Sequence, residues 1–181
     1  LLVNHLAPYL LTHELRGLLA AGPPARVVVT SSSVHRRGEL RLDDPTLAGE
    51  NDALDAYARS KLANVLFSTE PAGRFERAGE DVTALAYHPG FVPASGLYRE
   101  TGGAFGLAVS LAARLGVGQS VAEAGEDLVY AAGAPELADA PGAYLAGREP
   151  ESPDSRVGND ALRRRLWTES ARLVGVDPDW P

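Results

Sequence analysis

The chain has 181 residues and a formal net charge of −7. The length predicts a single domain over residues 1–181, and the negative charge argues against nucleic acid or an anionic membrane as a partner. The sequence contains no cysteine, which excludes disulfides, a thiol nucleophile and cysteine metal sites. This composition fits the reducing cytoplasm, where we expect the protein to act. No apolar stretch reaches the roughly 18 residues that a membrane-spanning helix needs, so no span is predicted.

The start of the chain predicts a helix, a buried strand and a loop. Residues 1–21 place leucines at helical spacing, although Pro8 is expected to kink or break the run, and Gly-Pro-Pro at 22–24 ends it. Residues 26–31 are β-branched and almost continuously apolar, as in a central parallel strand. The polar residues 35–51 are predicted to form a loop.

A long helix and a second strand follow. Residues 52–78 carry apolar side chains at helical spacing, with Pro71 expected to disturb the middle of the helix. Residues 81–87 are typical of a second strand, and His-Pro-Gly at 88–90 is predicted to end it.

The remainder of the chain is mainly helical. Helices are predicted at 103–115, at 120–132 with its first serine as the N-cap, and at 160–173. A short strand is predicted at 142–145 and a loop at 149–158. Strands that alternate with long helices indicate an α/β fold with a mainly parallel sheet.

A tyrosine and the chain's single lysine lie one turn apart in the second predicted helix. Tyr57 and Lys61 have i, i+4 spacing, which puts both side chains on one helix face. A free phenol has a pKa of about 10, and a nearby ammonium group favours its ionised form. The pair is therefore a candidate for proton transfer, the alternative being a solvated lysine on a helix surface.

Four short motifs stand in a fixed order along the chain: Val3-Asn4-His5-Leu6, the strand end 29–35 with its three serines, Tyr57-x-x-x-Lys61-Leu62-Ala63-Asn64, and His88-Pro89-Gly90. In order and spacing they resemble the short-chain dehydrogenase/reductase superfamily. The segment 60–67 and the late Leu166-Trp167 pair resemble its retinol-dehydrogenase-like branch. The resemblance covers essentially the whole chain. The chain matches only the C-terminal part of the family's domain, and the family's glycine-rich TGxxxGxG turn is absent from it. It implies a Rossmann-like, doubly wound parallel sheet with flanking helices, truncated at its N-terminus.

The resemblance implies hydride transfer between a nicotinamide cofactor and an alcohol or carbonyl group. In this chemistry Tyr57 exchanges a proton with the substrate oxygen, while Lys61 lowers the pKa of the phenol and binds the nicotinamide ribose. Ser32, at the carboxyl end of a predicted strand, would donate a hydrogen bond to the same oxygen. Ser31 and Ser33 are alternatives for this role, and a further interpretation is that the three serines only cap the turn.

The resemblance also assigns residues around the cofactor. Asn4 matches an asparagine that holds a water molecule in a proton relay from the lysine, and Pro89, Gly90 and Val92 match the turn that contacts the nicotinamide carboxamide. Ala94 stands where the family normally has a threonine that touches the diphosphate. The expected cofactor is NADP or NAD, with NADP favoured.

The substrate and partners are less constrained. The apolar segment 103–115 falls where the family's substrate lid lies and so favours a hydrophobic alcohol, ketone or aldehyde. A homo-oligomer is compatible with the family, and no metal site is expected because the four histidines lack metal-ligand spacing. Two other hypotheses stay open: a non-catalytic interaction protein that keeps the fold, and a non-functional fragment, since a dinucleotide site needs a glycine-rich turn.

Overall fold

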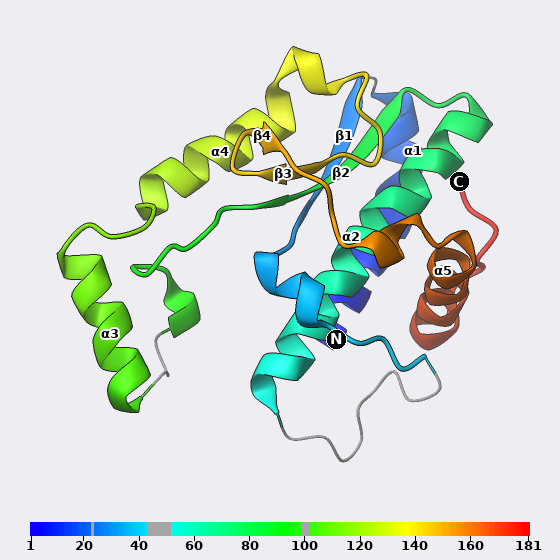
Figure 1. Cartoon of the computed structure of the whole chain (residues 1–181). Coiled ribbons are helices and arrows are strands. Elements are labelled where there is room, and N and C mark those ends of the chain that lie inside the picture. The colour runs from blue at the N-terminus through cyan, green and yellow to red at the C-terminus, as the bar shows by residue number, and fades with distance from the viewer. Residues whose placement is uncertain (23, 43–51, 99–101) are drawn as a thin grey trace.

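The sheet has four strands in the order β1-β2-β3-β4 (Figure 1). The computed structural model describes residues 1–22, 24–42, 52–98 and 102–181, so Pro23 and the predicted loop residues 43–51 lie outside the described residues. The strands are β1 Ala25–Thr30, β2 Val82–His88, β3 Tyr144–Ala146 and β4 Glu149–Pro150. The first three pair in parallel, and β4 runs antiparallel to β3. The predicted α/β class with a mainly parallel sheet is confirmed.

Each predicted helix is present among the described residues. The α-helices are α1 Ala7–Ala21, α2 Ala53–Ala78, α3 Gly103–Arg114, α4 Val121–Gly133 and α5 Asp160–Val174. Shorter helical segments are a π-helical turn at Leu2–Leu6 and 3-10 turns at Ser33–Arg37, Gly96–Tyr98, Pro135–Leu137 and Ser155–Gly158. None of the helices formed by the described residues combines the length and apolar character needed to cross a bilayer.

Side-chain caps fix the starts of α2 and α4. The Asp52 carboxylate accepts hydrogen bonds from the backbone N–H groups of Leu54 and Asp55 at 2.8 and 3.2 Å. Ser120 and Glu123 form a reciprocal capping box at the start of α4. These caps satisfy N–H groups that a helix cannot pair internally. They also explain why the sequence located both helix starts correctly.

The two prolines within predicted helices differ in their effects. Pro8 lies in the first turn of α1, directly after the π-helical turn Leu2–Leu6. The regular α-helix therefore begins only at Ala7, and the π-helical hydrogen bonding before it matches the expected break in the run near Pro8. Pro71 is inside α2, yet the helix runs unbroken from Ala53 to Ala78. The prediction of a disturbed middle was wrong, because burial of this segment against the core offsets the lost hydrogen bond.

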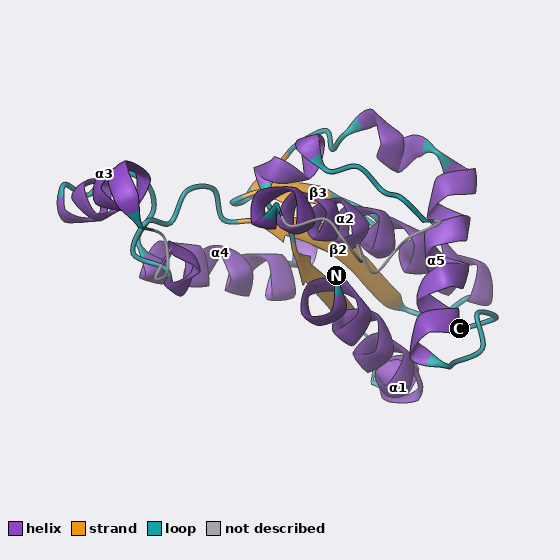
Figure 2. Cartoon of the chain, turned by 90° about the horizontal axis from the view of Figure 1, so that it is seen from below, coloured by secondary structure: helices purple, strands orange, loops and turns teal. Residues whose placement is uncertain are grey.

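Helices cover both faces of the sheet. On one face, Ala86 of β2 shares a core cluster with Leu66 of α2 and Leu166 of α5. On the other face, Leu85 of β2 shares a cluster with Ala131 of α4. Alternate residues of a strand point to opposite faces, so β2 contributes to both layers. Figure 2 shows α3 lying beyond α4, away from the sheet.

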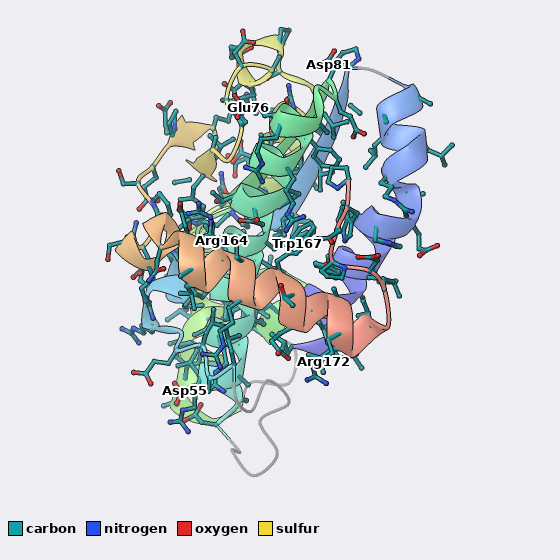
Figure 3. The ribbon with its side chains drawn as sticks, turned by 90° about the vertical axis from the view of Figure 1, so that its right-hand side faces the viewer. Asp55, Glu76, Asp81, Arg164, Trp167 and Arg172 are labelled. Atoms are coloured by element: carbon teal, nitrogen blue, oxygen red, sulfur yellow. The ribbon has the colours of Figure 1, made fainter. Side chains whose placement is uncertain are left out.

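Aromatic side chains fill the space between α1, α2, α5 and the C-terminal segment. The ring of Trp167 lies 4.4 Å from that of Trp180, 5.0 Å from that of Tyr9 and 6.1 Å from that of Phe67, measured between centroids. Trp167 is 2% exposed, and Figure 3 shows it on the inner side of α5, whereas Arg172 extends outward. This aromatic cluster ties the two ends of the chain to the long central helix.

Candidate functional site

The carboxyl ends of β1 and β2 open into a cavity of about 360 Å³. Parallel strands end at the same edge of a sheet, where open α/β sheets bind ligands. The cavity is lined by all the predicted site residues: Asn4, Ser32, Tyr57, Lys61, Pro89, Gly90 and Val92. Side chains that are far apart in the sequence therefore share one space, while the role of each stays a prediction.

Lys61 reaches from α2 to the end of β1. Its Nζ atom donates a hydrogen bond to the carbonyl oxygen of Thr30 at 3.0 Å and lies 5.4 Å from the centroid of the Tyr57 ring. The residue is 9% exposed, so it is not a solvated lysine on a helix surface. Burial lowers the pKa of its ammonium group, because desolvation disfavours the charged form.

The phenol of Tyr57 is less acidic than the sequence predicted. Burial raises its pKa above the ordinary value, a hydrogen bond with the Ser32 side chain acts in the opposite direction, and the nearby Tyr98 adds to the increase. The pKa in this structure is therefore raised, opposite to the predicted direction, and Lys61 is not among the causes of the shift. The ammonium is directed at Thr30 and does not offset the loss of hydration around the phenol.

The three serines after β1 have different surroundings. Ser31 is 2% exposed, and its hydroxyl donates a hydrogen bond to the backbone carbonyl oxygen of Lys61 at 2.9 Å. Ser33 is exposed to solvent. Ser32 lines the cavity, and its Oγ accepts a hydrogen bond from the Val34 N–H at 3.4 Å as the cap of the 3-10 turn. This arrangement supports Ser32 over its neighbours, and it shows that the same serine also caps the turn.

Asn4 is linked to the backbone of α2 rather than to the lysine. Its Nδ2 donates a hydrogen bond to Ser60 Oγ at 3.0 Å, and that hydroxyl donates to the carbonyl oxygen of Tyr57 at 2.7 Å. Asn4 and Lys61 line the same cavity. The relay predicted for Asn4 therefore has the required neighbours in one space, and the hydrogen bonds of Asn4 hold the helix turn that carries the tyrosine.

Asn64, beside the cavity, and Leu97 and Tyr98, which line it, were not singled out from the sequence. Asn64 is 1% exposed, and its Nδ2 donates a hydrogen bond at 3.0 Å to Thr30 O, the carbonyl that also binds Lys61. Its place in the same motif as the lysine was a usable signal. Leu97 and Tyr98 line the cavity from the segment after β2, and no local sequence pattern distinguishes them.

The predicted substrate lid takes a different position. Among the described residues, those of 103–115 do not contribute to the lining of the cavity. α3 approaches it through a ring contact between Phe105 and Tyr98, whose centroids are 6.4 Å apart. The apolar part of the wall comes instead from Val92, Leu97 and Val121, together with Tyr98.

A second hollow of about 820 Å³ lies between α1 and β1. It is lined by side chains of both elements, among them Leu11, Leu15 and Val29. Both spaces share Lys61 as a wall residue. The lysine therefore borders both the smaller and the larger cavity.

Gly38 sets the distance between the turn after Ser32 and α2. A Cβ atom here would lie 2.5 Å from the carbonyl oxygen of Ala58. We expect Gly38→Ala to lower the free energy of unfolding by about 1–3 kcal/mol, because backbone must shift to make room. Urea unfolding followed by circular dichroism measures the change. The matched variant Gly17→Ala, in an exposed part of α1 with nothing within 4 Å of the new Cβ, should be stabilised by up to about 1 kcal/mol. Equal stability of the two variants would contradict the packing described for Gly38.

Curated proteins of similar sequence are dehydrogenases. The chain is 38% identical over 179 residues to "Dehydrogenase/reductase SDR family member 13" of Bos taurus, covering 97% of this chain and 46% of that protein. It is 38% identical over 181 residues to human "Retinol dehydrogenase 13", covering 97% and 53%. It is 32% identical over 181 residues to "Retinol dehydrogenase 14" of Mus musculus, covering 96% and 52%. The chain thus spans about half the length of these relatives. No family model matches it.

Solved structures agree with these sequence similarities. An uncharacterized protein from Mycobacterium paratuberculosis is similar with a TM-score of 0.66 and 26% identity, over 98% of this chain and 59% of that one. A Pseudomonas syringae protein assigned as a short chain dehydrogenase is similar in fold, with a TM-score of 0.54 and 23% identity over 80% of this chain and 49% of that one. Sequence, sheet topology and site geometry agree: the chain belongs to the short-chain dehydrogenase/reductase superfamily, in its retinol-dehydrogenase-like branch.

Proposed function

We propose that the protein is an oxidoreductase that transfers a hydride between NADP or NAD and the carbon of an alcohol or carbonyl group. The observation that carries the proposal is the convergence of Tyr57, Ser32 and Lys61 on one cavity of about 360 Å³. Asn4 completes the proton relay from the same wall. The similarity to two retinol dehydrogenases supports this reaction class.

Tyr57 holds the proton that the substrate oxygen gains or loses. Because burial raises its pKa, the phenol is protonated at neutral pH and can donate to a carbonyl oxygen as negative charge develops there. The Ser32 hydroxyl, which lines the same cavity as the phenol, donates to the same oxygen and stabilises that charge. At neutral pH the phenol is therefore in the form that reduction of an aldehyde or ketone requires.

Lys61 and the turn after β2 would hold the nicotinamide and its ribose. An ammonium group has three donors, and Lys61 uses one of them for Thr30, which leaves donors for ribose hydroxyls. Gly90 has a left-handed φ of 74° and no heavy atom within 4 Å of the place of a Cβ, so its backbone is open to a ligand. Pro89 and Val92 line the same wall. These residues fit a nicotinamide, which when bound supplies the hydride acceptor or donor. NADP stays the favoured form.

We propose an apolar small molecule of the retinol and retinal class as the substrate. Beyond the phenol, the cavity wall is formed by Val92, Leu97, Tyr98 and Val121, which suits a hydrocarbon chain next to the reacting carbon. Two relatives carry retinol in their names. A homo-oligomer and a cytoplasmic location stay predictions.

The test is reduction of retinal at millimolar NADPH, followed by the loss of its absorbance. High cofactor concentrations are chosen because the sequence has no glycine-rich turn for the pyrophosphate, and we expect weak binding to this chain. Ser32→Ala should lower kcat/KM by about 10²–10³-fold, since it removes a donor to the developing oxyanion.

The adjacent serine provides the control. Ser33 is exposed and outside the cavity, so Ser33→Ala should leave turnover unchanged. An equal loss in both variants would assign the effect to a damaged turn rather than to a donor at position 32. No turnover by the unmodified chain with NADPH or NADH would favour the two alternatives, a non-catalytic protein that keeps the fold or a non-functional fragment.

A further inference from the structure

Two buried histidines bind the two turns that flank the cavity. His35 is 0% exposed, and its Nδ1 lies 2.8 Å from the carbonyl oxygen of Ser32. His88 is 8% exposed, and its Nδ1 accepts a hydrogen bond from the Gly90 N–H at 3.1 Å. Neither imidazole lines the cavity. Each imidazole instead contacts a backbone group of a residue that lines the cavity, the Ser32 carbonyl oxygen for His35 and the Gly90 N–H for His88.

The partners of each ring define its protonation state. His35 Nε2 accepts a hydrogen bond from the backbone N–H of Asp154 at 3.1 Å, so the proton of the neutral ring is on Nδ1 and is donated to Ser32. His88 has the opposite tautomer, because its Nδ1 is an acceptor and its Nε2 lies 3.2 Å from Glu151 Oε2. Both rings use both nitrogens, and each arrangement requires one nitrogen without a proton.

Tyr144 joins the two histidines from β3. Its ring stacks on His88 with centroids 5.5 Å apart and meets His35 edge-on at 5.0 Å. A second link runs outside the rings, where Arg36, in the turn after Ser32, pairs with Glu151 at 2.7 Å. The turn after β1 and the turn after β2 are thus connected through packed rings and a charged pair.

We propose that His35 and His88 are positioning residues that hold these two turns in register across the cavity, and that protonation of His88 releases the Gly90 amide. The inference rests on the proposed function, because it gives these turns their roles in hydride transfer. Gly90 is exposed, with nothing within 4 Å of the place of a Cβ. The bond to His88, rather than close packing, therefore fixes the orientation of its amide.

The surrounding charges set the conditions for this release. The titratable and charged groups that face the pair are Arg36, Tyr144, Glu151 and Asp154, the last of which pairs with Arg156. A hydrogen bond from Arg36 is the main cause that lowers the pKa of Glu151, so Glu151 stays ionised. Burial lowers the pKa of His35 and keeps that ring neutral.

The test compares two isosteric replacements of His88. In His88→Asn the side-chain oxygen takes the place of Nδ1 and can still accept the Gly90 N–H, as in an Asx turn. In His88→Gln the side chain reaches the place of Nε2 and leaves the Gly90 amide without its acceptor. The full chain is labelled with ¹⁵N-glycine and ¹⁵N-histidine, and the Gly90 cross-peak is assigned by its loss in Gly90→Ala.

We expect the Gly90 amide shift to titrate with the imidazole nitrogens of His88, with one common midpoint. His88→Asn should keep the Gly90 shift of the neutral form at all pH values, while His88→Gln should show the shift of the acidic form at neutral pH. In the retinal assay, His88→Gln should lower kcat/KM by about tenfold to a hundredfold, since small misplacements of a positioning group have effects of this size. His88→Asn should keep the kcat/KM of the unmodified chain.

Three outcomes decide between the possibilities. A Gly90 shift that ignores the titration of His88, or identical spectra for the two variants, would overturn the proposal. Matching thermal unfolding of both variants shows that any difference does not come from loss of the fold. Coupling of the Gly90 amide to His88 without turnover by the unmodified chain would support the positioning role of the histidines and contradict the proposed reaction. The positioning proposal and the proposed function can therefore fail independently.

Discussion

Replacement of Tyr57 by phenylalanine is expected to remove cofactor-dependent turnover and leave the protein folded. Tyr57 is half-buried at the cavity wall, and the change deletes one hydroxyl without changing the volume of the ring. General acid catalysis of this kind contributes about 10²–10⁴-fold, so kcat should fall by at least this factor. Retinal reduction at saturating substrate measures the loss, and circular dichroism checks the fold.

The pH dependence gives this prediction a second readout. The pKa of Tyr57 is raised by burial, and in the reduction direction the protonated phenol is the active form. The rate should therefore stay constant through neutral pH and fall only as the pH passes the raised pKa, while alcohol oxidation should show the opposite trend. The residual rate of Tyr57→Phe should lack this step. A variant that keeps the rate and its pH profile would end the assignment of Tyr57 as the acid.

Trp167→Ala is expected to cause the largest loss of stability in the chain. Its indole lies between Tyr9, Phe67 and Trp180, and Arg74 stacks on its face with Cζ 4.4 Å from the ring centroid. Truncation of a buried aromatic residue typically costs about 3–5 kcal/mol. This is a large part of the roughly 5–15 kcal/mol that stabilises a domain. Urea unfolding followed by circular dichroism should show the midpoint moving to much lower concentration.

Two further variants test whether the loss in Trp167→Ala comes from the packing of the indole. Trp167→Phe keeps an aromatic ring but loses the hydrogen bond from Nε1 to Pro178 O at 2.7 Å. Arg74 also donates to that carbonyl, so the acceptor stays satisfied and the loss should be smaller. Leu107→Ala, at a side chain that is 73% exposed on α3, should change stability by less than about 0.5 kcal/mol. Similar losses at positions 167 and 107 would contradict the placement of the core.

Much of the fold was predictable because its signals are local. Ser120 begins its helix through a capping box with Glu123, and both residues are close neighbours in the sequence. The β-branched residues of 25–30 and the apolar residues of 82–88 form the two parallel strands that a buried sheet requires. The i, i+4 spacing of Tyr57 and Lys61 placed both at one cavity.

The features that were mispredicted depend on distant contacts. The pKa of Tyr57 is set first by burial, which depends on how the segments around the phenol fold over it and not on the helix alone. Pro71 is tolerated because its helix is packed on several sides. The part played by His88 follows from Tyr144 and Glu151, residues more than fifty positions downstream. Local spacing contains none of this information.

The chain's lone lysine has a practical consequence. Since Lys61 lines both cavities, a reagent that acylates ε-amines modifies one side chain, and that side chain faces the place where a ligand would bind. Its lowered pKa increases the share of free amine, the form that reacts. Mass spectrometry of the peptide that contains Lys61 would then report occupancy of the site, with no engineered label, because a molecule bound there shields the amine from attack.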